Sequence, residues 1–155
     1  MHALLTVIVT WLSINFDLPA IYEHPNVEFV SAAKMAEVRY SRLASNRLDR
    51  VEAETARSVP PELGYDVHAI YDDGSQTIYL PEGWTGTTPA EVSVLVHELS
   101  HHLQNVAELK YDCSEAREKP AYQAQARWLE LFGQSLASEF GIDAMTILVR
   151  TNCMR

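Results

Sequence analysis

The stretch His97-Glu98-Leu99-Ser100-His101 is the most informative part of this chain of 155 residues. Two histidines four residues apart project from one face of an α-helix, so both imidazoles can share one metal ion. The intervening Glu98 is placed to hold and deprotonate a water molecule on that ion. An HExxH motif with these roles is typical of zinc hydrolases, most often peptidases. The motif therefore predicts Zn²⁺ as cofactor, His97 and His101 as ligands, and Glu98 as general base.

The residues around the motif predict that it lies on a helix. Thr88 can serve as the N-cap, Pro89 suits the first helical position, and Glu91 can close a capping box. Apolar residues then recur at helical spacing and form one stripe, made of Val92, Leu95, Val96, Leu99, Leu103 and Val106. The two histidines of the motif fall beside this stripe, so we expect them at the edge of the core.

A third ligand is needed, because a catalytic zinc site normally has three protein ligands and one open position. The longer motif HExxHxxGxxH is excluded, since Gln104 and Ala107 stand where it needs glycine and histidine. His102 points about 100° around the helix from His101, which makes it a poor third ligand. We expect His102 to lie on the helix surface or to support a ligand, and the third ligand to come from a later segment.

A second helix is predicted after the motif. Asp112 or Ser114 can cap it, and apolar residues continue at helical spacing as far as Phe140. Pro120 lies inside this segment, where it should kink the helix or mark its first turn. The segment offers two glutamates, Glu115 and Glu118, as the missing ligand.

Together the two predicted helices resemble the gluzincins, zinc peptidases that carry an HExxH helix and a glutamate ligand on a following helix. The resemblance covers residues 65–132 and is greatest to the minimal, single-domain form (minigluzincin-like). It implies that Glu118 is the third ligand, and the Ala-Tyr that follows favours Glu118 over Glu115.

Tyr122 is a departure from the larger gluzincins, which often carry an aspartate at this position to orient a ligand histidine. Its hydroxyl could take over that task or stabilise an oxyanion, so Tyr122 is a candidate catalytic residue beside Glu98. Packing in the core is an equally good interpretation of this residue.

The remaining elements predict an α+β fold. Residues 25–30 are typical of a short strand, and Ser31 can cap a helix through Leu43, with more helix over 43–57. Residues 67–71 and 77–80 predict a hairpin around an Asp-Asp-Gly-Ser turn.

With the resemblance to the gluzincins, the fold class implied is a single small zincin-like α+β domain over residues 1–155. In it a short antiparallel or mixed sheet packs on the HExxH helix, which is followed by a ligand-bearing helix. By the resemblance, Thr77–Leu80 is an edge strand to which an extended peptide substrate adds. A structural hairpin with a covered edge is the alternative.

Charge limits the partners. The chain has 12 basic and 21 acidic residues, a net charge of −9, and no basic residue between Ser58 and Leu109. An acidic surround of the motif suits a divalent cation and neutral or positively charged substrates, and it argues against a phosphate backbone. We therefore expect a peptide or protein substrate and no nucleic acid.

The N-terminus and the cysteines leave the compartment open. Residues 3–14 are apolar but too few to span a bilayer, so we expect a core helix rather than a targeting segment and no stable membrane span. Cys113 and Cys153 can form a disulfide in an oxidising compartment or stay reduced. The cytoplasm is slightly favoured, and export is the alternative.

The function expected from the sequence is hydrolysis of a peptide bond by a zinc-activated water, with Glu98 as general base. A module that keeps the zincin fold to bind a metal or another protein, without catalysis, is the alternative.

Overall fold

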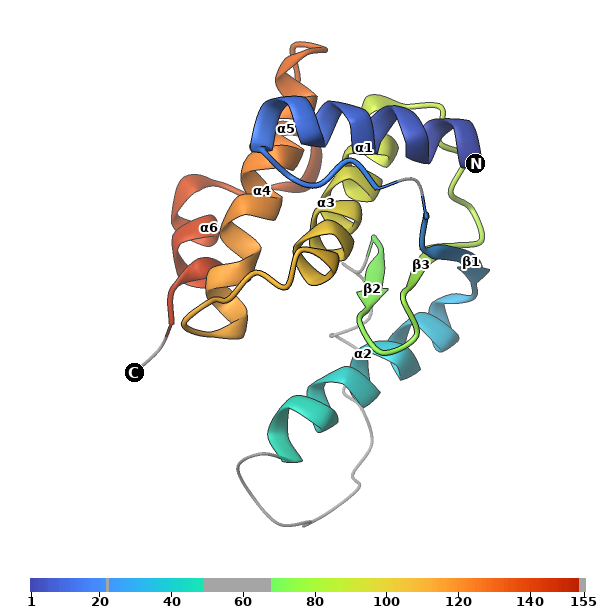
Figure 1. Cartoon of the computed structure of the whole chain (residues 1–155), viewed down its shortest axis with the longest axis vertical. Helices are drawn as coiled ribbons and strands as arrows, with labels where there is room; N and C mark the ends of the chain where they lie inside the picture. The colour runs from blue at the N-terminus through green and yellow to red at the C-terminus, as the bar shows by residue number, and fades with distance from the viewer. Residues whose placement is uncertain (22, 49–67, 154–155) are drawn as a thin grey trace. The chain divides into compact units, whose positions relative to one another are not determined.

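The computed structural model describes residues 1–21, 23–48 and 68–153, without the side chains of 42–48. Within these ranges the chain has a small α+β fold with six helices and a three-stranded mixed sheet (Figure 1). The α+β prediction is therefore confirmed. The chain divides into two compact units, Met1–Pro25 with Thr85–Arg155, and Asn26–Trp84.

The unit Asn26–Trp84 contains the sheet. Strand β1 (Asn26–Val30) leads into helix α2 (Ala32–Leu48), and strands β2 (Ile70–Asp72) and β3 (Thr77–Pro81) form the predicted hairpin. The expected cap of α2 is present, because the backbone N–H of Lys34 donates to Ser31 Oγ at 3.3 Å. The helix predicted beyond residue 48 lies outside the described residues.

The sheet overturns one prediction, namely that Thr77–Leu80 is an edge strand. The strand order is β1-β3-β2, with β1 parallel and β2 antiparallel to β3. Ile78 of β3 faces Val27 on one side and Tyr71 on the other, so β3 is the central strand of the described sheet and not an edge strand. Alternating hydrophobicity predicts a strand but not its neighbours, and the parallel partner comes from a distant part of the chain.

The unit Met1–Pro25 with Thr85–Arg155 is helical. Its elements are α1 (His2–Phe16), α3 (Pro89–Val106), α4 (Ser114–Glu130), α5 (Leu136–Phe140) and α6 (Ala144–Thr151) (Figure 1). Helix α3 contacts α1 and α4, and α4 also contacts α5 and α6. Helix α3 is therefore covered on two sides, which agrees with its nearly continuous burial from Val92 to Gln104.

Helix α1 is the core helix expected from the apolar N-terminal segment. Its buried residues, Leu5, Ile8, Val9 and Leu12, repeat at helical spacing along one face. The ring of Trp11 meets the ring of Trp128 on α4 edge to face, with centroids 5.3 Å apart. Among the described helices, none has both the length and the apolar character needed to cross a membrane.

Helix α3 begins as predicted, with Thr88 as N-cap, Pro89 in the first turn and a complete capping box. The carboxylate of Glu91 accepts backbone N–H groups of Thr85, Thr87 and Thr88 at 2.8, 3.2 and 3.2 Å. It also accepts the hydroxyls of Thr85 and Thr88. These hydrogen bonds, led by the one from the Thr85 N–H, lower the pKa of Glu91 from 4.5 to about 2.

The Glu91→Gln variant should be less stable than wild type at pH 7 by about 1 kcal/mol, because an amide replaces a charge-assisted acceptor. The folded-state pKa lies below the ordinary value, so this stabilisation is complete above about 4.5 and is lost as the pH falls through about 2. Urea unfolding of both proteins at several pH values measures the difference. A difference that does not shrink toward low pH would contradict the assignment.

Helix α4 differs from its prediction at both ends. Its N-cap is Cys113, whose Sγ accepts the N–H of Ala116 at 3.3 Å, and Pro120 lies inside the helix rather than in its first turn. The helix ends at Glu130 and does not continue to Phe140. Gly133 has a φ of 71°, and a new capping box at Ser135 starts α5. Apolar residues recur at helical spacing across this break, so their periodicity alone could not reveal where the helix ends.

A disulfide joins Cys113 to Cys153, with their Cα atoms 5.8 Å apart, and settles the pairing that the sequence left open. It connects the N-cap of α4 to the residue that follows α6 by two positions. The bridge closes a loop with a sequence separation of 40 residues. In the chain-entropy account, a loop of that length destabilises the unfolded state by about 4 kcal/mol.

Removal of the bridge by Cys153→Ser should therefore lower the free energy of unfolding by about 2–4 kcal/mol. Cys113→Ser should cost the same, because serine remains a good N-cap, whereas Cys113→Ala should lose about 1 kcal/mol more. Urea unfolding under non-reducing conditions compares the three variants. Wild-type stability in both serine variants would rule out the bridge as a stabilising link.

Candidate metal centre

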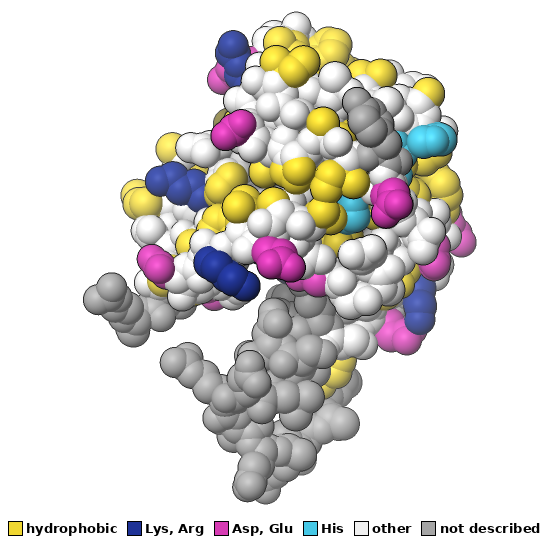
Figure 2. Space-filling model, in the orientation of Figure 1, with side chains coloured by type: hydrophobic (Ala, Val, Ile, Leu, Met, Phe, Trp, Pro, Cys, Tyr) yellow, Lys and Arg dark blue, Asp and Glu magenta, His cyan; other side chains and the backbone are white. Residues whose placement is uncertain are grey.

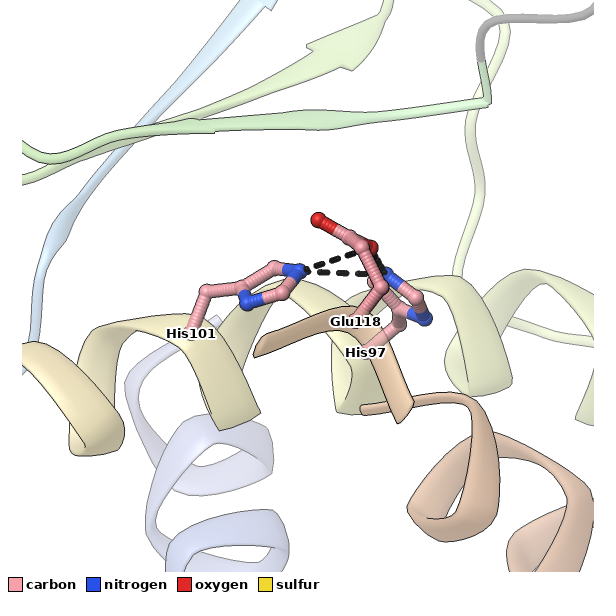
Figure 3. Close-up of side chains that lie close together, drawn as sticks. All are labelled: His97, His101 and Glu118. Atoms are coloured by element: carbon pink, nitrogen blue, oxygen red, sulfur yellow. Dashed lines mark hydrogen bonds and ion pairs between the residues drawn. The ribbon is translucent and has the colours of Figure 1, made fainter. Parts of the chain in front are cut away.

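Three side chains meet on the facing surfaces of α3 and α4. His97 and His101 come from α3, one turn apart, and Glu118 comes from α4 (Figure 3). Glu118 Oε2 lies 3.1 Å from His97 Nε2 and 3.3 Å from His101 Nε2, and the two Nε2 atoms are 3.2 Å apart. The structure thus brings together the three residues that the sequence predicted as ligands.

These distances fit a tetrahedral metal ion. Zinc–nitrogen and zinc–oxygen bonds of about 2.0–2.1 Å give a tetrahedron whose edges are about 3.3 Å long. The three ligand atoms are separated by 3.1–3.3 Å and so outline one face of such a tetrahedron. The fourth corner is contributed by no residue of the cluster, which leaves one position for water or substrate.

Glu118, and not Glu115, lies at the histidines. Glu115 lies in the first turn of α4, is exposed, and accepts a hydrogen bond from the Ser114 hydroxyl at 3.1 Å. Glu118 lies one turn further along the helix and has a partly buried side chain. Of the two glutamates that the sequence offered, Glu118 is therefore the one that the structure places at the two histidines.

The two histidines and Glu118 perturb one another's pKa values. Burial raises the pKa of Glu118, but the hydrogen bonds from His101 and His97 outweigh it and hold the pKa well below its usual range. Burial lowers the pKa of His97, but the hydrogen bond to Glu118 and the charge of Glu98 outweigh it, so the pKa is raised. A metal ion that binds to the two Nε2 atoms needs both without hydrogen, so its binding would depend on pH.

Glu98 and Tyr122, the two predicted catalytic residues, both lie next to His97. Glu98 is buried on α3, and its charge raises the pKa of the His97 ring. The Tyr122 ring meets the His97 ring edge to face, with centroids 4.7 Å apart. Its hydroxyl accepts a hydrogen bond from Arg150 on α6 at 3.0 Å. Tyr122 also packs in the core with Leu129, so the core interpretation holds for its ring.

Each histidine has a glutamine on its other ring nitrogen, and the sequence reasoning missed both. Gln125 Oε1 lies 3.1 Å from His97 Nδ1, and Gln104 Oε1 lies 3.0 Å from His101 Nδ1. Spacing could have indicated them. Gln125 lies seven residues after Glu118 on the same face of α4, and Gln104 lies three residues after His101 on α3.

His102 is buried, with 3% of its surface exposed. Of its two interpretations, a helix-surface residue is therefore wrong.

On the face seen in Figure 2, the Lys and Arg side chains of the described residues lie scattered and form no basic patch.

Comparison with family models assigns the chain to a protein family. The model of DUF6647, described as a domain of unknown function, matches residues 47–155, and the chain belongs to this family. The matched residues include the HExxH motif, Glu118 and both cysteines. Comparisons with curated proteins and with solved structures give no match.

Proposed function

We propose that this protein is a zinc-dependent hydrolase, a peptidase of the gluzincin type with a zincin-like fold. The observation that carries the proposal is the triangle of His97 Nε2, His101 Nε2 and Glu118 Oε2, with edges of 3.1–3.3 Å. Two imidazoles and one carboxylate are a donor set typical of catalytic zinc. The motif between the two histidines supplies the base that hydrolysis needs.

When bound, a zinc ion supplies Lewis acidity that polarises a carbonyl and activates water for attack. Glu98 accepts the proton of the attacking water and passes it to the leaving amine, so that the peptide C–N bond breaks and a carboxylic acid and an amine form. The burial of Glu98 and its electrostatic effect on His97 support this role. Carboxylate bases in such sites act over one hydrogen bond.

Tyr122 is the candidate donor to the oxyanion. Its oxygen accepts a hydrogen bond from Arg150, which leaves the hydroxyl hydrogen free to donate and polarises the O–H bond. The substrate class proposed is a peptide or protein segment that is neutral or positively charged. The sequence has no Lys or Arg over 58–109, a stretch that contains the HExxH motif and is rich in acidic residues, and such a charge balance favours neutral or cationic partners.

Metal content tests the ligand set. Wild-type protein equilibrated with zinc and desalted should retain about one zinc per chain, and Glu118→Ala should retain far less, because two histidines alone bind zinc weakly. Glu115→Ala is the matched control on the same helix and should bind like wild type. Elemental mass spectrometry of the three proteins measures the ratio. Equal zinc in Glu118→Ala and wild type would remove Glu118 as a ligand.

The Glu98→Gln variant tests the base. It should keep the zinc content of wild type, because Glu98 is not a ligand, and it should lose peptide hydrolysis by at least about 100-fold. Release of new amino termini from an unfolded protein and from a peptide mixture measures the activity. Activity close to wild type in Glu98→Gln would exclude Glu98 as the base. Zinc binding without any cleavage by wild type would favour the non-catalytic metal-binding module.

A further inference from the structure

The two glutamines behind the metal centre are buried and fully engaged. Gln104 and Gln125 are 1% and 5% exposed, respectively, although glutamine is mostly a surface residue. A buried amide is costly unless its oxygen and its NH₂ group both find partners. Both groups of both glutamines do so here, and each amide oxygen faces a ligand histidine.

The orientation of the Gln125 amide is fixed by the group on its far side. Ser93 Oγ donates its only hydrogen to the carbonyl of Ala90 at 2.7 Å. Toward Gln125, at 3.3 Å, that hydroxyl can therefore only accept, so the NH₂ group of Gln125 must face it. The amide oxygen then faces His97 Nδ1, which must carry a hydrogen.

The Gln104 amide is fixed in the same way by Arg117. The NH₂ group of Gln104 donates to the backbone carbonyl of Arg117 at 3.2 Å, and a carbonyl can only accept. Arg117 Nε donates to Gln104 Oε1 at 3.2 Å, and an arginine nitrogen can only donate. The oxygen of Gln104 therefore also faces His101 Nδ1, which must carry a hydrogen.

Arg117 further ties the two ligand-bearing helices together. Its Nη2 donates to the backbone carbonyl of His101 at 2.8 Å, and it directly precedes Glu118 on α4. Four hydrogen bonds among Arg117, Gln104 and His101 thus join the second histidine to the turn that carries the carboxylate ligand. These four hydrogen bonds, here called the clamp, lie beside the three ligand atoms and involve none of them.

We propose that Gln104, Gln125 and Arg117 are positioning residues of the metal centre, which lock both histidines with hydrogen on Nδ1 and the Nε2 lone pair directed at the ion. The proposal deepens the proposed function, because it rests on the same three ligands. A ring whose orientation and tautomer are already fixed presents Nε2 to a metal ion without rearrangement. An acceptor on Nδ1 also makes the imidazole more basic and so a better ligand. The clamp meanwhile keeps the Glu118 carboxylate close to the two Nε2 atoms.

The test compares leucine and glutamate at both glutamine positions. Gln125→Leu and Gln104→Leu remove the acceptor at similar size and should weaken zinc binding about 10–100-fold. Gln125→Glu and Gln104→Glu keep an acceptor toward the ring but lose the NH₂ donor on the far side. Each should therefore recover part of the zinc affinity that the leucine variant at the same position loses. Gln123→Leu, on the exposed face of α4, is the matched control and should have no effect. Competition with a chromophoric chelator measures the zinc affinity.

The ring nitrogens give a readout that a merely structural role would not change. Nitrogen and proton NMR of the metal-free protein at neutral pH should show a hydrogen-bonded Nδ1–H on both histidines in wild type, whichever group of the cluster holds a proton on the Nε2 side. In Gln125→Leu this signal should lose its hydrogen-bonded shift at His97 alone, and in Gln104→Leu at His101 alone. Unchanged Nδ1–H signals in the leucine variants, or no recovery of zinc affinity in the glutamate variants, would overturn the proposal.

Failure of this inference can be told apart from failure of the proposed function. The Nδ1–H signals are read in metal-free protein and need neither zinc nor a substrate. If the wild-type protein binds zinc but cleaves nothing, the positioning roles are still decided by the two measurements above. If it binds no zinc, the metal centre itself is wrong, and the roles proposed for the three residues are overturned with it.

Discussion

The contact between α3 and α4 at Glu118 is the constraint on which the helical unit depends. Two imidazoles and a carboxylate converge within 3.3 Å in a largely buried place, and a bare carboxylate there would be costly. A proton or a metal ion must therefore bind the three groups together. The hydrogen bonds from Gln125 to His97 and from Arg117 to the His101 carbonyl join the same two helices beside the cluster. The disulfide at Cys113 fixes the start of α4 a little more than one turn earlier.

Much of the site could be predicted because its signals are local. The capping box and the apolar stripe define α3, and the spacing of the two histidines puts them on one face. The preference for Glu118 over Glu115 needed the family resemblance, since either glutamate suits the same helix. Helix geometry then explains the outcome, because Glu118, Tyr122 and Gln125 share one face and all three contact His97.

The parts that escaped prediction depend on distant or competing interactions. The parallel pairing of β1 with β3 joins segments far apart in the sequence, and it turned an expected edge strand into the central one. Helical spacing ran on past Glu130, while Gly133 and the cap at Ser135 ended the helix locally. The roles of Gln104 and Gln125 are properties of a contact between two helices, and no pattern along a single helix states which partner a buried amide will meet.

The neutrality of the groups behind the histidines bears on the chemistry proposed for the centre. A carboxylate on Nδ1 would add negative charge and make each imidazole more basic, whereas an amide orients the ring without charge. Gln104 also shares its oxygen with the positively charged Arg117, which withdraws electron density from the acceptor of His101. With Glu118 as the only anionic ligand, a divalent ion would keep most of its positive charge for polarising a carbonyl. Neutral acceptors on Nδ1 make the two imidazoles less basic than carboxylates would, which lowers the affinity for a metal ion. The fixed orientation of the two rings offsets this loss.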